Sequence, residues 1–90
     1  MKRLEIIHLR SSGRPLDSLG ERIRESIRAG GQDEAVVTLY RRHGLETDLA
    51  VHVRYSGELQ ETGPSDIALK LASALRAYGL VEHTLWEELP

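Results

Sequence analysis

The sequence contains no cysteine, so disulfide bonds and thiolate metal sites are excluded. This absence fits a reducing compartment, and the cytoplasm is the predicted location. No apolar run approaches the roughly 18–20 residues that a membrane-spanning helix needs. The apolar stretch near Met1 is too short for a signal peptide, and it is interrupted by Glu5 and His8. We therefore expect a soluble protein with no membrane partner.

Aromatic residues are scarce, with one tryptophan, three tyrosines and no phenylalanine among 90 residues. RNA-recognition domains stack bases on aromatic side chains of two central strands. Of the two segments that would form those strands, 3–10 has no aromatic residue and 49–55 has only Tyr55. The second segment also departs from the signature of those domains. Together with a net charge of −2, this predicts that no nucleic acid is bound.

Charge is unevenly divided along the chain. Residues 1–42 carry nine Lys/Arg and six Asp/Glu, whereas residues 43–90 carry three Lys/Arg and eight Asp/Glu. Such asymmetry steers two copies of a chain, or a charged ligand, toward one another. The alternative interpretation is that two solvated helix faces differ by chance.

The hydrophobic pattern predicts six elements in one domain that spans residues 1–90. Four segments are predicted to be strands: 3–10, 35–42, 48–56 and 80–87. The third alternates most cleanly, with one face formed by Leu49, Val51, Val53 and Tyr55. Residues 43–47 are short and include glycine, so the second and third strands should form a hairpin.

Two helices lie between these strands. The first begins near Pro15, or slightly later if Ser18 and Glu21 form a capping box, and ends at Gly30-Gly31. Its apolar stripe comprises Leu16, Leu19, Ile23 and Ile27. The second runs from about 66 to 78, with Ser65 as its N-cap and Gly79 as its C′ residue. Its expected buried face comprises Ile67, Leu71, Ala74, Leu75 and Tyr78, widened by Ala68 and Ala72.

The order β-α-β-β-α-β predicts an α+β fold of the ferredoxin-like plan. Because both crossovers should be right-handed, both helices cover one face of a four-stranded antiparallel sheet in the order 4-1-3-2. This plan is shared by many unrelated functions, so it identifies none of them.

The other face of the sheet should then be bare and of mixed polarity. We expect Ala50, His52 and Arg54 on it, since the opposite side of their strand is apolar. The first strand contributes either Leu4 and Ile6 or Ile7 and Leu9, and the last strand adds Trp86 or Leu85. A thin-cored domain with such a patch is expected to form a homodimer, through its sheet faces or its edge strands.

Tyr40, His52 and Arg54 are the candidate ligand-binding residues, because neighbouring strands bring them to this bare face. An imidazole beside an arginine suits a small anionic ligand. The alternative is that His52 packs across the strands and that Arg54 pairs with an acidic neighbour.

His8, His52 and His83 lie on three neighbouring strands and could share a metal ion only if all three occupied one face. The pattern does not decide which face of its strand each histidine occupies, and no metal-ligand spacing supports such a site. We predict no metal, no cofactor and no assigned catalytic residue.

Two function hypotheses remain. The first is a non-catalytic module that dimerises and binds a small anionic ligand or a protein partner. The second is a small dimeric α+β-barrel enzyme with a cleft on the open sheet face. No sequence motif decides between them.

Overall fold

The computed structural model describes residues 3–11, 17–29, 35–44, 47–55, 63 and 65–89. Within them lie four strands and two helices: β1 (Arg3–Ser11), α1 (Asp17–Ala29), β2 (Ala35–Arg41), β3 (Asp48–Tyr55), α2 (Asp66–Leu75) and β4 (Gly79–Glu87). The predicted start of the first helix near Pro15 and the helical position of Leu16 lie outside the described residues, as do the side chains of Ile27 and Tyr55.

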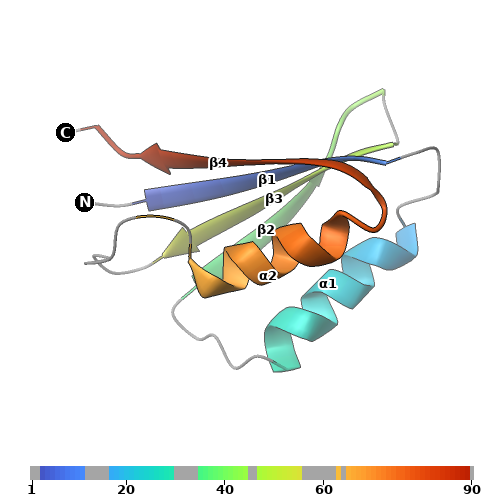
Figure 1. The fold of residues 1–90 in the computed structure, drawn as a ribbon, viewed down its shortest axis with the longest axis horizontal. Coiled ribbons are helices and arrows are strands. Elements are labelled where there is room, and N and C mark those ends of the chain that lie inside the picture. Colours follow the sequence, from blue (N-terminus) through green and yellow to red (C-terminus); the bar gives the residue numbers. More distant parts are fainter. Residues whose placement is uncertain are drawn as a thin grey trace.

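The strands form one antiparallel sheet in the order β2-β3-β1-β4. Read from the other edge, this is the predicted order 4-1-3-2, so the predicted α+β architecture is confirmed. Figure 1 shows that α1 and α2 lie side by side on one face of the sheet. In the part of the chain that the structure describes, no helix lies on the opposite face.

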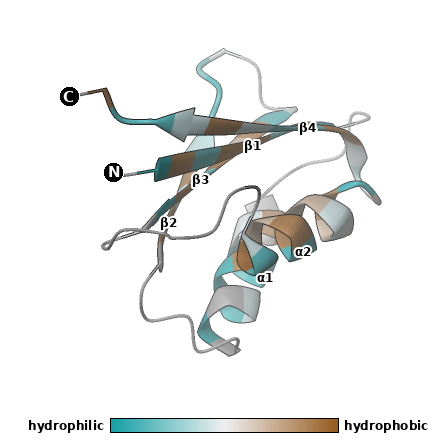
Figure 2. Ribbon diagram, turned by 60° about the vertical axis from the view of Figure 1, so that its left-hand side comes forward, coloured by the Kyte–Doolittle hydropathy of each residue, from teal (hydrophilic) through white to brown (hydrophobic). Residues whose placement is uncertain are grey.

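The hydrophobic core lies between the sheet and the helices. In β1 and β3 the buried apolar residues are odd-numbered, because successive strand side chains point to opposite faces. Figure 2 shows hydrophobic and hydrophilic stretches along β1, but their order does not follow this rule, because apolar residues occupy both sides of that strand. The core side chains are Ile7, Leu9, Leu19, Ile23, Leu49, Val51, Val53, Ile67, Ala68, Leu71, Ala72 and Leu75.

Helix α2 begins as the sequence predicts. The Oγ of Ser65 accepts a hydrogen bond from the backbone N–H of Ala68 at 3.3 Å, which satisfies one of the free donors of the first turn. The carboxylate of Asp66 lies in that first turn, near the positive end of the helix dipole. This cap fixes where the chain leaves the preceding loop and packs on the sheet.

The predicted end of α2 is wrong. The helix stops at Leu75, and Gly79 is the first residue of β4 rather than a C′ residue. Ala74 is exposed, although we expected it on the buried face. The buried face of α2 is centred nearer Ala68 and Ala72 than we expected, because their small side chains let the helix approach the sheet closely. Ala74 therefore lies at the edge of the buried face.

The described residues contain no helix long and apolar enough to cross a membrane.

Candidate functional site

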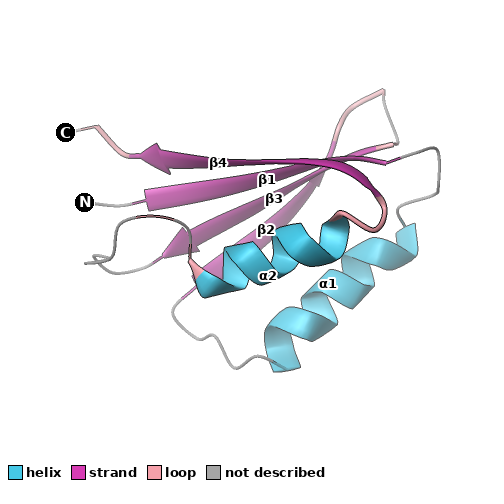
Figure 3. Cartoon of the chain, in the orientation of Figure 1, coloured by secondary structure: helices cyan, strands magenta, loops and turns pink. Residues whose placement is uncertain are grey.

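The side of the sheet that neither described helix covers (Figure 3) is here called the open face, and it carries the even-numbered residues of all four strands. Cross-strand partners confirm that Ala50, His52 and Arg54 belong to it, as predicted for β3. The parity of β1, which the sequence left undecided, places Leu4, Ile6, His8 and Arg10 there. The exposed apolar residues of the open face are Val36, Tyr40, Leu80 and Trp86.

A hollow of about 450 Å³ lies in the open face. This volume is in the usual range for small-molecule sites, about 300–1,000 Å³. Its apolar lining includes Ile6, Tyr40, Ala50 and Trp86. Its charged and polar lining includes His8, Arg41, Arg42, Asp48 and Glu82. The hollow therefore joins an apolar floor to charged groups that lie mainly toward β2 and β3.

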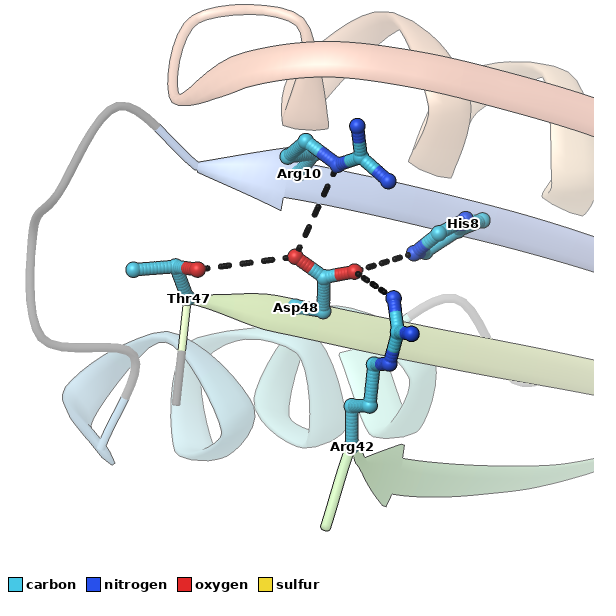
Figure 4. Close-up of polar contacts among 5 residues, drawn as sticks. All are labelled: His8, Arg10, Arg42, Thr47 and Asp48. Carbon is cyan, nitrogen blue, oxygen red and sulfur yellow. Dashed lines mark hydrogen bonds and ion pairs between the residues drawn. The ribbon is translucent and has the colours of Figure 1, made fainter. Parts of the chain in front are cut away.

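Asp48 is the centre of the charged end. Its side chain is 1% exposed although it begins β3 on the open face, because His8, Arg10 and Arg42 cover it (Figure 4). The Nε2 of His8 lies 3.0 Å from Oδ2 of Asp48, and Nη1 of Arg42 donates to the same oxygen at 3.3 Å. The Nε of Arg10 is 3.8 Å from Oδ1, and Oγ1 of Thr47 donates to Oδ1 at 3.5 Å.

Burial alone would raise the pKa of the Asp48 carboxyl. The hydrogen bonds from His8 and Arg42, and then the positive charges of His8 and Arg10, outweigh burial and hold this pKa below its usual value. Asp48 is therefore ionised at neutral pH, and an ionised carboxylate only accepts hydrogen bonds. It follows that Nε2 of His8 carries the shared hydrogen and that, in the neutral ring, Nδ1 holds the lone pair.

The three residues singled out from the sequence do share the open face. The rings of Tyr40 and His52 have centroids 4.6 Å apart and are tilted by 53°. Arg54 is exposed and lies two residues further along β3. Of the three, only Tyr40 lines the hollow. The structure thus places the His52 ring against the Tyr40 ring, while neither His52 nor Arg54 lines the hollow.

His52 is held in a setting that favours the neutral ring. Desolvation by burial lowers the pKa of its imidazole, and the positive charge of Arg54 lowers it further. Its Nδ1 is buried without a hydrogen-bond partner in the described part of the chain. These features suit a packing histidine that stays uncharged at neutral pH.

The three histidines do not share a face. His8 and His52 lie on the open face, whereas His83 pairs with Ile7 on the helix side of the sheet. There Nε2 of His83 is 3.4 Å from Oε1 of the buried Glu5, outside hydrogen-bond geometry. Glu5 also accepts hydrogen bonds from the backbone N–H of Ser65, at 2.9 Å, and from its hydroxyl. Within the described ranges, no three His, Asp or Glu side chains converge to hold a metal ion.

Sequence reasoning missed Asp48, His8 and Arg42 as a group. The signal was present in the hairpin, because a short link between the second and third strands sets Arg42 opposite Asp48. The backbone N–H of Arg42 does donate to the Asp48 carbonyl, at 3.2 Å. The contribution of His8 depends on the parity of β1, which apolar residues on both sides of that strand concealed.

Comparison with known proteins adds support for the fold. No protein-family model and no curated protein matches the chain. Among solved structures, that of Rv0793 from Mycobacterium tuberculosis is similar, with a TM-score of 0.63 and 17% sequence identity, over 100% of this chain and 97% of that one. At this identity the similarity shows a shared α+β fold and nothing about activity.

Proposed function

We propose that this protein is a small binding module that forms a homodimer through its open face and holds a small anionic ligand in the hollow of that face. The observation that carries the proposal is the hollow itself, with an apolar floor and a charged end on the side of the sheet that neither described helix covers. The cytoplasm remains the predicted location.

The charged end favours an anion near β2 and β3. Asp48 contributes one negative charge, whereas Arg10 and Arg42 contribute two positive charges around it. A guanidinium has five N–H donors, and one from Arg42 is used on Asp48. The Arg42 side chain is 58% exposed at the rim of the hollow, so its remaining donors are accessible to a carboxylate or phosphate.

The apolar part of the hollow favours a ligand with an apolar or aromatic tail. Trp86 and Tyr40 stand at opposite edges of the open face, and Ile6 and Ala50 lie between them. Aromatic and aliphatic walls of this kind contribute affinity by desolvation, while a few polar groups orient the ligand. A small carboxylate with an aromatic tail has the chemistry that matches both parts.

A second copy of this chain is the proposed occupant of the surrounding surface. Val36, Tyr40, Leu80 and Trp86 expose apolar area on one face, while the core lies entirely on the other. The charge of the open face is also polarised, since Glu82 lies on β4 and Arg54 and Arg42 lie on or beside β3 and β2. A two-fold axis parallel to the strands places β4 of each copy over β2 of the other, which brings opposite charges together.

Binding is tested by titrating phenylacetate against the fluorescence of Trp86, the single tryptophan of the chain, which lines the hollow. We expect saturable quenching, and we expect Arg42→Gln to weaken the affinity about tenfold or more, the usual effect of losing one hydrogen bond to a charged group. Arg76→Gln, at the exposed end of α2, is the control and should leave the affinity unchanged.

Arg54→Gln distinguishes the hollow from the site predicted from the sequence. A loss of affinity in Arg54→Gln, with Arg42→Gln unaffected, would move the anion to the group formed by Tyr40, His52 and Arg54. No quenching at millimolar phenylacetate would contradict the proposed ligand class.

A small dimeric enzyme with its cleft on the open face is the second candidate function. The observation that favours it is the pairing of His8 with Asp48 at the edge of the hollow, because a histidine oriented by a buried carboxylate is a recurrent arrangement for proton transfer.

A further inference from the structure

We infer that His8 is a general base that removes a proton from the carbon next to the carbonyl of a small 2-oxo carboxylate, and that Asp48 is the residue that positions it. The inference rests on the proposed ligand-binding role of the hollow. It adds a reaction, a substrate class and a catalytic residue to that role.

The geometry joins a base to an anion-binding group. Nε2 of His8 and Nη1 of Arg42 both approach Oδ2 of Asp48, at 3.0 Å and 3.3 Å. Figure 4 shows the two side chains reaching this oxygen from β1 and from the chain just beyond β2. Because one buried oxygen holds both, the imidazole lies beside the guanidinium at a fixed place on the wall of the hollow.

The tautomer leaves the correct nitrogen free. Ionised Asp48 fixes the hydrogen on Nε2, so neutral His8 has its lone pair on Nδ1. The structure gives Nδ1 no hydrogen-bond partner among the described residues. The His8 side chain is 35% exposed and lines the hollow, so this nitrogen is accessible to a ligand on that face.

The substrate class follows from the groups around the base. Arg42 suits the carboxylate, and the apolar lining formed by Ala50 and Tyr40, level with His8 in the sheet, suits an aromatic or aliphatic tail. A carbonyl next to the carboxylate makes the adjoining C–H acidic enough for an imidazole near neutral pH. A 2-oxo acid with an aromatic tail combines these three features.

In the proposed step, the C–H bond next to the carbonyl breaks and its electron pair becomes that of an enolate. The proton forms a bond to Nδ1 of His8, and the imidazolium is stabilised by Asp48 through the Nε2 hydrogen bond. The proton then returns to carbon or exchanges with water. No oxidant, reductant or further reactant is needed.

The groups that face His8 come from every neighbouring strand. Asp48 on β3 contacts the imidazole of His8 and the guanidinium of Arg42, which lies just beyond β2. Arg10 lies two residues after His8 on β1 and also contacts Asp48. Glu82 on β4 pairs with His8 across the sheet. Glu82 also lines the hollow and is the rival base that the experiment must separate from His8.

The test is deuterium incorporation at C3 of phenylpyruvate in D₂O, followed by proton NMR and corrected for the protein-free rate. We expect the wild-type protein to accelerate exchange and His8→Ala to lower the catalysed rate about 100-fold, within the usual range for a general base. Added imidazole should restore part of the rate in His8→Ala, measured against the same imidazole without protein. The control is His43→Gln, an exposed histidine outside the hollow, whose rate should equal that of wild type.

Asp48→Asn should lower the rate and alter its pH profile, because the asparagine no longer fixes the hydrogen on Nε2. If Asp48→Asn does not fold, His8→Ala with imidazole rescue decides alone. Exchange that is retained in His8→Ala but lost in Glu82→Gln would overturn the assignment of the base. Quenching of Trp86 by phenylpyruvate without exchange would overturn the reaction and leave the binding function standing, whereas absence of quenching would contradict both.

Discussion

Gly79→Ala is expected to lower the free energy of unfolding by about 3 kcal/mol, the upper part of the usual range for overpacking. Gly79 begins β4 and pairs with Ser11 at the edge of the sheet. A Cβ added there would lie 2.2 Å from the carbonyl oxygen of Arg10 and 2.8 Å from Cα of Ser11. Both are backbone atoms, so no side-chain rotation relieves the clash. Because small domains are stable by only about 5–15 kcal/mol, the loss is a large fraction of the total.

Gly20→Ala is the matched control with the opposite sign. Gly20 lies inside α1, and a Cβ there would make an ordinary contact with Leu39 Cδ1 at 3.6 Å. Replacing a helical glycine by alanine should stabilise the protein by about 0.5–1 kcal/mol. Urea denaturation of both variants measures the effects. A Gly79→Ala variant as stable as wild type would mean that β4 does not approach the end of β1 as described.

We expect Asp48→Asn to lower the free energy of unfolding at neutral pH. We also expect the free energy of unfolding of this variant to fall less than that of wild type as the pH is lowered. The pKa of the Asp48 carboxyl is lowered from 3.8, so the folded state binds its proton less readily than the unfolded state. Its stabilising contribution is therefore complete above about pH 4 and is lost as the pH falls through the lowered pKa. In Asp48→Asn this contribution is absent at every pH, and His8, Arg10 and Arg42 lose their shared anion.

His52 provides an internal reference in the same measurement. The pKa of His52 is lowered from 6.5, so its neutral ring contributes stability above about pH 6.5, and this is lost as the pH falls toward the lowered value. That part of the curve should persist in Asp48→Asn. The exposed Asp66 is the control, since Asp66→Asn should keep the acid-dependent part that Asp48→Asn loses. An unchanged difference between wild type and Asp48→Asn from pH 6 to pH 2 would contradict the role of Asp48.

The architecture could be predicted because one strand and one helix carry unambiguous patterns. The alternation of Leu49, Val51 and Val53 identified the inner face of β3, and Ser65 identified the start of α2. Once one strand face and two crossovers are known, handedness leaves little freedom in the order of the strands.

The face presented by β1 could not be predicted in the same way. Ile6 and Ile7 are both apolar, yet Ile7 is fully buried in the core and Ile6 lines the hollow. Glu5 contradicts the usual pattern further, because this carboxylate is buried on the helix side and is satisfied by Ser65. That pairing joins residues 60 positions apart, so no local pattern indicates it.

The candidate site was missed for a related reason. Asp48 at the start of a strand has the pattern of a solvent-exposed residue, yet it is buried beneath the side chains of His8, Arg10 and Arg42. Tyr40 was found because the hairpin brings it to the same face as His52. The charged partners were not, since their convergence depends on the register of three strands.

The central claim is that the open face binds a second copy of this chain around a ligand, and its most direct test is the molar mass in solution by light scattering over a wide concentration range. We predict twice the chain mass of 10.1 kDa for wild type. Trp86→Lys, on the open face, should give the single-chain mass, whereas Leu85→Lys should remain dimeric, because the comparably exposed Leu85 lies on the helix side of the same strand. A wild-type protein of 10.1 kDa at every concentration, or a dimer that survives Trp86→Lys and dissociates in Leu85→Lys, would contradict it.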